Sequence, residues 1–477
     1  MKTLLLIIAF AGFIFSQTNY EKVNLEISKG NFTIAAKMID SLIFHNVSLT
    51  EVEKYDLEFQ KDRLNRIRLD FNKNYNDVLT YVKKYYPDAD EKLLQKWEES
   101  KVLEMMVIDG EKKYFARAAS NIFLIDKEAK AQKQNIDGKK EDELDKFCEG
   151  IIPGIISNSV NAKTRNVNPL KLKLKYSLTV DPNFVPDGEV IRCWLPFPRE
   201  IKNRQENIKL NSISEQEYII ADNKNLQRTI YVEKKAVKDK PTVFKMELEY
   251  TSFADYTNVE ADKVKGYDVN SDLYKVFTTE RPLHIVFTDR VKEVSEKIIG
   301  DETNPYLKAK KIFTWISQTK PWAGAREYST IENISDYILR EGHGDCGIKT
   351  LLFVTLCRYN GIPAKWQSGW MLHPVEVNLH DWGEVYFEGY GWVPVDQSFG
   401  IQNLSDEKEK YFYLGGLDQY RLIANDDYSQ PLFPAKIYPR SETVDFQRGE
   451  VEWRGGNLYF DKWDYHMDVE YEEVSTK

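Results

Sequence analysis

The pattern of apolar and polar positions changes along the chain. In residues 18–150 apolar side chains recur at helical spacing, as at Ala35, Ile39 and Leu42, and β-rich runs are few. Near Pro169 the period becomes two. Periods of 3.6 and two are typical of helices and of half-buried strands. We therefore predict a helical amino-terminal domain followed by a β-rich domain.

Three segments carry the strand pattern most clearly. Residues 171–178 and 244–250 alternate apolar with charged or polar side chains, and residues 190–195, apolar except for Arg192, form a further strand that ends at Pro196. Short alternating strands of this kind are typical of a sandwich of two sheets. We predict a small β-sandwich over residues 166–260.

From Arg281 onward helices and strands are mixed. We expect one helix to begin at Pro305, since proline favours the first helical turn, and a second to begin at Gly347. Three strands should follow the second helix: residues 365–371, 379–388 and 392–396. A helix followed by an antiparallel sheet predicts an α+β core.

The changes of pattern also suggest where the domains begin and end. The predicted division is 1–17 signal peptide, 18–165 helical domain, 166–260 β-sandwich, 261–445 catalytic core and 446–477 carboxy-terminal strands. Residues 126–145 are mostly charged. A run of mixed charge can be a solvated helix or a domain boundary, and the sequence leaves both open.

The first residues have the composition of a secretory signal. Lys2 precedes the apolar run 4–15, and Ser16 and Gln17 then end it. This run is shorter than the ~20 residues that span a bilayer, so we expect a cleaved signal rather than an uncleaved anchor. No later segment reaches membrane-spanning length, and we expect an exported protein, periplasmic or extracellular.

Charge and cysteine content exclude two classes of protein. The net charge of −9, with both signs interspersed, argues against a nucleic-acid partner. The four cysteines form no C-x-x-C pair, so we predict no metal site. Cys357 lies about 16 Å along a helix from Cys346, too far for a disulfide, and should be a buried thiol. Cys148 and Cys193 could pair.

The densest chemical signal surrounds Cys346. Glycines at 342, 344 and 347 flank this cysteine, and an amphipathic helix follows it up to Asn360-Gly361. A helix N-terminus stabilises a thiolate and offers N–H groups to an oxyanion. Cys346 is therefore the candidate nucleophile, and we expect its pKa to lie well below the usual value.

A thiol nucleophile needs a base and a group that orients the base. His380, at the start of a strand, is the best candidate for the base, ahead of His343 and His373. A hairpin would bring Asp396 beside His380, where it could fix the imidazole tautomer. Asp381 should point to the opposite face of the strand, so Asp381→Asn should be nearly silent.

Four motifs together resemble the transglutaminase-like superfamily. They are Gly344-Asp345-Cys346, the run from Cys357 to Ala364, the run from His380 to Tyr386, and the run from Gly391 to Asp396. The overall layout is similar to transglutaminase-domain proteins exported by Bacteroidetes-type bacteria. The resemblance implies a papain-type, cysteine-proteinase core with a Cys346–His380–Asp396 triad. It also implies an upstream side chain that helps bind the oxyanion, for which Trp322 and Tyr328 are the candidates.

The resemblance implies a reaction class as well. Catalytic members attack an amide carbonyl with the thiolate and form a thioester, with no cofactor. Hydrolysis, as in a peptidase or amidase, is the favoured outcome, and protein-glutamine cross-linking or a catalytically silent peptide- or glycan-binding role are the alternatives. The expected partner is a protein or peptide, including glycopeptides. Trp382 and His343 are the candidate substrate-cleft residues.

Overall fold

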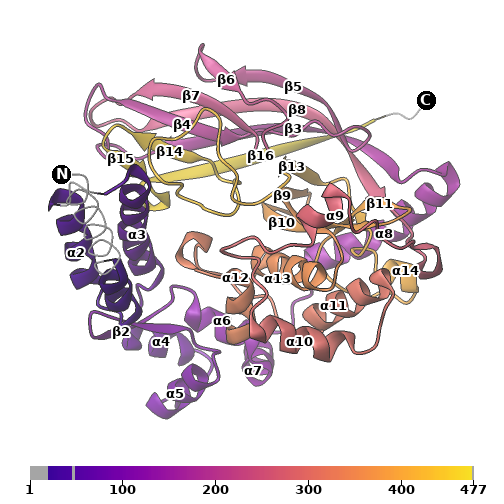
Figure 1. Cartoon of the computed structure of the whole chain (residues 1–477), viewed down its shortest axis with the longest axis horizontal. Coiled ribbons are helices and arrows are strands. Elements are labelled where there is room, and N and C mark those ends of the chain that lie inside the picture. Colours follow the sequence, from indigo (N-terminus) through magenta and orange to yellow (C-terminus); the bar gives the residue numbers. More distant parts are fainter. Residues whose placement is uncertain (1–19, 46–48, 475–477) are drawn as a thin grey trace, which may run out of the picture. The chain divides into compact units, whose positions relative to one another are not determined.

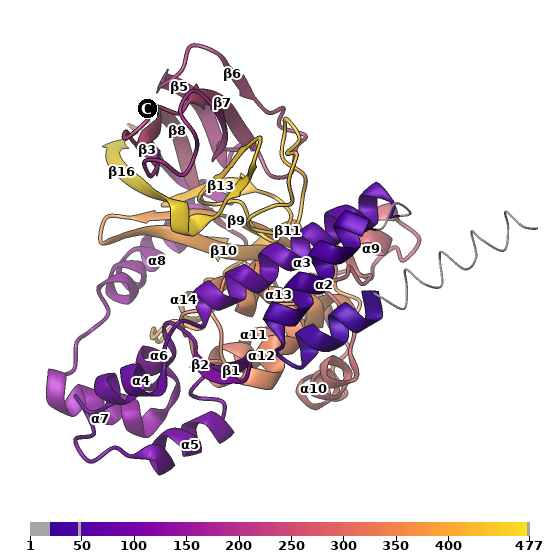
Figure 2. The ribbon, with the colours of Figure 1, turned by 90° about the vertical axis from the view of Figure 1, so that its left-hand side faces the viewer.

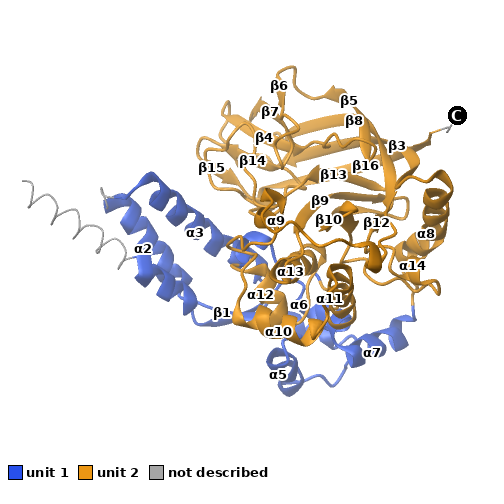
Figure 3. Ribbon diagram, turned by 45° about the vertical axis from the view of Figure 1, so that its right-hand side comes forward, with its two compact units in different colours: residues 1–139, 324–331 blue, residues 140–323, 332–477 orange. Residues whose placement is uncertain are grey.

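The computed structural model describes residues 20–45 and 49–474, so the predicted signal at 1–17 lies outside the described residues. The chain divides into two compact units, and the positions of the two units relative to one another are not determined (Figure 3). Unit 1 contains residues 1–139 and 324–331, and unit 2 contains residues 140–323 and 332–477. Across the described residues, no helix is both long and apolar enough to cross a bilayer.

Unit 1 is largely helical, as its apolar periodicity predicts. Residues 20–28 are helical, and a short hairpin, β1–β2, interrupts the helices. The named elements are α2 (Phe32–His45), α3 (Glu51–Asp70), α4 (Tyr75–Val82), α5 (Glu91–Glu99), β1 (Met105–Ile108), β2 (Glu111–Tyr114), α6 (Ala118–Ile125), α7 (Lys127–Asp137) and the 3₁₀ turn η2 (Tyr328–Thr330). The charged run 126–145 holds both the helix α7 and the boundary between the units.

Unit 2 opens with α8 (Glu143–Ala162), which leads into the sandwich. Two five-stranded sheets form this sandwich: β12-β8-β3-β16, with β5 paired to β8, and β15-β14-β4-β7-β6. Their strands are β3 (Asn166–Val180), β4 (Val190–Pro196), β5 (Gln205–Ile213), β6 (Tyr218–Ile220), β7 (Thr229–Lys235), β8 (Thr242–Tyr256), β12 (Gly416–Leu417), β14 (Glu450–Trp453), β15 (Gly456–Leu458) and β16 (Trp463–Glu473).

The carboxy-terminal strands complete this sandwich. β16 pairs with β3 over its whole length, and β14 pairs with β4. The sequence places the sandwich within 166–260, but strands from the far end of the chain supply part of both sheets. Long-range pairing of this kind leaves no local signal, which explains why periodicity alone did not reveal it.

The remainder of unit 2, its α+β core, has a four-stranded antiparallel sheet, β11-β10-β9-β13. Figures 1 and 2 show this sheet between the sandwich and the helices α10–α13. The elements of the core are η1 (Ala261–Lys263), α9 (Asp272–Phe277), α10 (Asp289–Ile299), α11 (Pro305–Thr319), α12 (Ile334–Glu341), α13 (Cys346–Tyr359), β9 (Ala364–His373), β10 (Glu376–Phe387), β11 (Gly391–Val395), α14 (Glu407–Lys410) and β13 (Arg421–Asn425). The predicted α+β class is confirmed, with the helix at Pro305 and the three strands near the expected positions.

The sheet of the core and the sandwich share one hydrophobic core. Trp370 and Leu372 of β9, with Leu422 of β13, belong to the same buried cluster as the inner faces of the sandwich strands. The rings of Trp370 and Tyr176 stack at 5.0 Å between centroids. The sandwich is therefore the packing support of the sheet that carries the site.

Candidate active site

Cys346 lies at the first residue of α13, as the sequence predicts. Asp345 caps this helix, because its side chain accepts a hydrogen bond from the Ile348 N–H at 3.2 Å. A Cβ at Gly344 would meet Ile348 Cγ2 at 2.4 Å, so close packing requires glycine there. Cys346 as a whole residue is partly exposed, whereas its sulfur is buried. Local capping and packing thus fix the helix start at the candidate nucleophile.

The β10–β11 hairpin joins His380 to Asp396. Gly383 pairs with Val395 in this hairpin, which places the next residue, Asp396, beside the middle of β10, close to His380. His380 Nε2 lies 2.8 Å from Asp396 Oδ2, and both side chains are buried. The predicted contact between these two residues is confirmed, whereas their role in catalysis stays a prediction.

Asp396 is held as a carboxylate. Its Oδ1 accepts hydrogen bonds from the N–H groups of Ser398 and Phe399, each at 3.1 Å. Its Oδ2 accepts one from Arg421 Nη1 at 2.9 Å. Burial by itself would raise the pKa of Asp396, but the charges of His380 and Arg421 and these hydrogen bonds lower it to about 2.

His380 is neutral near pH 7. Burial lowers its pKa, and the positive charge of Arg421 lowers it further, while Asp396 opposes both effects. Because Asp396 is ionised, the neutral ring carries its hydrogen on Nε2 and donates it to that carboxylate. Nδ1 then has a lone pair available to accept a proton, as a general base requires.

Arg421 extends this network deeper into the protein. Its guanidinium also contacts Asp418, with Nη2 2.9 Å from Oδ2, and it is fully buried. Asp418 in turn lies 3.1 Å from His373 Nε2. Neither Arg421 nor Asp418 is predicted from the sequence, because a buried ion pair on and before a short strand gives no local signal. His373, a weak candidate for the base, is fully buried beside Asp418.

The sulfur of Cys346 meets Asp381. Its thiol donates a hydrogen bond to Asp381 Oδ2 at 3.4 Å. Among the residues that the structure describes, no hydrogen bond joins this sulfur to His380. His380 and Asp381 do have different partners, as strand alternation predicts, but the side chain that meets the thiol is that of Asp381 and not that of His380.

The predicted low pKa of Cys346 is also wrong for this arrangement. Burial of the sulfur, followed by the negative charges of Asp381 and Asp345, raises the pKa of this thiol well above its usual value. The partial positive charge of the helix N-terminus is about half an elementary charge, less than the charge of one carboxylate. This arrangement therefore favours the protonated thiol of Cys346 over the thiolate.

Lys349 brings a cation into the same region from the first turn of α13. Its Nζ donates to the Ser398 carbonyl at 3.4 Å, and the side chain is buried. Burial lowers the pKa of Lys349 to about 8, against the opposing charges of Asp396, Cys346 and Asp345. This lysine can exchange a proton near neutral pH, and its position was not predicted.

The remaining predicted site residues fall into two groups. Trp382 and His343 are buried, with 0% and 3% exposed surface, so neither lines an open cleft in this structure. Trp322 is 46% exposed, and its backbone bridges to Gly344, two residues before the thiol. Tyr328 is buried in η2 of unit 1. Its predicted oxyanion role, like that of Trp322, stays a prediction.

The other three cysteines are free and buried. Cys148 and Cys193 do not pair, and Cys357 is a core thiol, as its helical position predicts. Burial raises the pKa of each of the three above its usual value. No group of three or more metal-ligating side chains occurs within residues 20–45 and 49–474.

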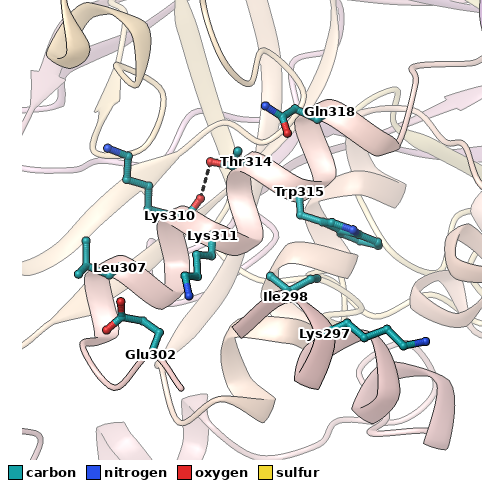
Figure 4. A pocket seen from close by; sticks show the side chains of 9 residues that line it. All are labelled: Lys297, Ile298, Glu302, Leu307, Lys310, Lys311, Thr314, Trp315 and Gln318. Carbon is teal, nitrogen blue, oxygen red and sulfur yellow. Dashed lines mark hydrogen bonds between the residues drawn. The ribbon is translucent and has the colours of Figure 1, made fainter. Parts of the chain in front are cut away.

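A groove of about 470 Å³ lies between α10 and α11 (Figure 4). Trp315 and the stems of Lys297 and Lys311 line it, and it contains none of the candidate catalytic residues. The Lys311 ammonium is bonded to the Ile299 carbonyl. Cys346, His380 and Asp396 are not among its lining residues, so the groove is distinct from the candidate active site.

Residues 292–397 match the family model of the transglutaminase-like superfamily. The chain is 26% identical over 250 residues to an uncharacterized protein of Haemophilus influenzae, covering 45% of this chain and 66% of the relative. It is 24% identical over 152 residues to the uncharacterized protein YebA of Bacillus subtilis, covering 28% of this chain and 21% of the relative. The chain thus spans less than two thirds of each of these curated relatives.

Solved structures give partial likenesses. One is described as "a Putative Cysteine Protease from Cytophaga hutchinsonii", at 17% identity and a TM-score of 0.45, covering 65% of this chain and 93% of that chain. Another is the periplasmic domain of TgpA from Pseudomonas aeruginosa, at 11% identity and a TM-score of 0.26, covering 52% of this chain and 91% of that chain. The family match supports a cysteine enzyme in general terms.

Proposed function

Given the transglutaminase-like domain at residues 292–397, we propose that the protein is an exported thiol hydrolase that cleaves amide bonds of proteins or peptides. The observation that carries the proposal is the 2.8 Å contact between His380 Nε2 and Asp396 Oδ2, within a core whose central helix begins at Cys346. The proposed nucleophile, base and orienting group are Cys346, His380 and Asp396. Export rests on the apolar run 4–15.

The proposed reaction begins with a proton transfer. The S–H bond of Cys346 breaks, His380 Nδ1 takes the proton, and the sulfur lone pair forms a bond to the amide carbon. The N–H groups at the start of α13 stabilise the oxyanion, and Trp322 is the candidate side chain beside them. When the C–N bond breaks, His380 returns the proton to the departing amine. Asp396 stabilises the transient imidazolium throughout.

The thioester is then released by water. His380 takes a proton from water, and hydroxide adds to the thioester carbon. The C–S bond then breaks, His380 returns the proton to the sulfur, and the acid leaves. A lysine amine in place of water would give an isopeptide bond, which is the transamidase alternative. A silent binding protein would perform neither step, and the complete set of three catalytic residue types argues against it.

The deciding experiment compares wild type with Cys346→Ala in the exporting cell and as purified protein. We expect new protein amino termini or released amines with the wild type and none with the variant. Cys193→Ala, which alters a buried thiol of the sandwich, is the matched control and should retain activity. New isopeptide bonds would favour the transamidase instead. Equal products from wild type and Cys346→Ala would refute a thiol enzyme.

A further inference from the structure

The Asp381 carboxylate accepts hydrogen bonds from two residues: Cys346, and Gln447 from a distant segment of the chain. While one carboxylate oxygen accepts from Cys346, the other accepts a hydrogen bond from Gln447 Nε2 at 2.7 Å. The same amide nitrogen donates to the His380 carbonyl at 2.8 Å. Asp381 has 1% exposed surface. A buried carboxylate bonded on both oxygens has little freedom to leave the sulfur.

Gln447 belongs to a long connection that has no helix or strand of its own. Residues 426–449 join β13 to β14, and connections of this length usually have a function. Trp370 Nε1 donates to the Gln447 carbonyl at 2.8 Å, and Asn425 Nδ2 donates to the Phe446 carbonyl at 2.9 Å. Arg440 pairs with the buried Glu450. Hydrogen bonds and an ion pair therefore fix this connection at several points, and they hold Gln447 in contact with His380 and Asp381.

Burial raises the pKa of the Cys346 thiol most, and the charges around the sulfur act on it next. Asp381 faces it from β10 and Asp345 from the cap of α13, and both carboxylates disfavour a thiolate. Lys349 is the cation from α13, and it is shared with Asp396. His343 lies three residues before the thiol. The neutral His380 is bonded to Asp396, so it adds no positive charge near the sulfur.

We propose that Asp381, oriented by Gln447, is a positioning residue that keeps Cys346 as a hydrogen-bonded thiol in the free enzyme. The thiol becomes a nucleophile only when it turns from Asp381 to His380. This inference rests on the proposed function of Cys346. Asp381 itself is a poor proton acceptor, because an ordinary carboxyl titrates near 4 and an ordinary imidazole near 6.5, much closer to a thiol.

The test is the pH profile of Cys346 alkylation by iodoacetamide, measured by mass spectrometry on the full chain. Asp381→Asn keeps the shape and removes the charge. We expect its midpoint to fall by at least about one pH unit, which is roughly a tenfold faster reaction below the midpoint. Gln447→Leu frees Asp381 and should shift the midpoint in the same direction by less. Glu384→Gln, on the same strand but paired with Lys365, should leave it unchanged.

An unchanged or higher midpoint in Asp381→Asn would overturn the inference, and a slower reaction at every pH would make Asp381 the base instead. If that variant fails to fold, an unshifted profile in Gln447→Leu overturns it equally. In urea, where the chain is unfolded, all variants should show the same pH dependence of Cys346 alkylation. Failure of the proposed function would look different: Cys346→Ala would retain turnover whatever the alkylation profile of Asp381→Asn.

Discussion

Asp396 accepts hydrogen bonds from His380, Arg421 and two backbone N–H groups, all in a buried setting. One carboxylate therefore orients the candidate base and neutralises a buried guanidinium. From the sequence alone we expect Asp396→Asn to lower the enzymatic activity and to leave the melting temperature unchanged. The ion pair with Arg421 changes that expectation, because a buried charge that loses its partner is costly.

We expect Asp396→Asn to lose both activity and stability. Loss of imidazole orientation can lower kcat by up to about 10⁴, and loss of part of a buried ion pair costs about 3 kcal/mol. Turnover and urea unfolding measure the two effects. Asp418→Asn, which weakens the Arg421 pair but does not touch His380, should lose stability and retain more activity. Wild-type stability in Asp396→Asn would contradict the role of Arg421.

Arg421 also affects the titration of His380. Its charge is among the causes that lower the pKa of the imidazole, after burial. In Arg421→Met we expect the pKa of His380 to rise, so the fraction of neutral base falls at any pH near that value. The His380 ring signal in an NMR titration measures this, and Arg421→Lys should restore most of the effect. A midpoint that does not move would exclude electrostatic control by Arg421.

At the scale of elements, the site depends on how closely β13 lies against β9. Gly369 of β9 pairs with Ile423, and a Cβ at Gly369 would meet the Leu422 carbonyl oxygen at 1.9 Å. Backbone at that distance cannot move aside cheaply. The pairing that brings Arg421 to Asp396 therefore requires glycine at position 369, a requirement that the sequence pattern does not reveal.

We expect Gly369→Ala to separate β13 from β9, at a cost of about 1–3 kcal/mol. Displacement of Arg421 should also raise the pKa of Asp396, because Arg421 is one of the groups that lower it. Thermal unfolding measures the first effect. The control is Gly150→Ala in α8, where nothing lies within 4 Å and alanine should stabilise the helix by up to about 1 kcal/mol. Equal melting temperatures of Gly369→Ala and Gly150→Ala would show that the Leu422 carbonyl does not exclude a side chain at position 369.

At the scale of the whole molecule, the chain passes from unit 2 into unit 1 and back between α11 and α12. Within unit 1, Asp70 accepts hydrogen bonds from the Glu327 N–H at 3.1 Å and from Thr330 Oγ1 at 3.2 Å. Asn121 Nδ2 donates to the Gly324 carbonyl at 2.8 Å. The segment 324–331, which leads towards the helix α12 and then the thiol, is thus bonded into the helical unit.

The stability of the folded state should depend on pH through Asp70. Burial, followed by the charge of Glu327, raises the pKa of Asp70 to about 7. The native state then binds more protons than the unfolded state between about pH 4 and 7, so stability falls as pH rises through that window. We expect Asp70→Asn to melt at a higher temperature than wild type at pH 8, with the difference vanishing near pH 4. The exposed Asp88→Asn is the control, and a pH-independent difference would contradict the assignment.

The sequence by itself determined the elements and the residue types of the site. Apolar periodicity is a local property, so it predicted the helical first unit, the strands near 171–178 and 244–250, and the helix that begins at Cys346. The hairpin that joins His380 to Asp396 is also local, because a short turn fixes its register. Both predictions depend on residues that are close in the chain.

Only the tertiary structure decided which charges surround the thiol and what completes the sandwich. Arg421, Gln447 and the strands β14 and β16 come from distant parts of the chain, and their partners are chosen by packing and not by spacing. Asp381 was visible as a neighbour of His380, but its contact with Cys346 depends on where α13 meets β10. The protonation of the thiol follows from those placements, because burial and neighbouring charge shift its pKa away from the ordinary value of a cysteine.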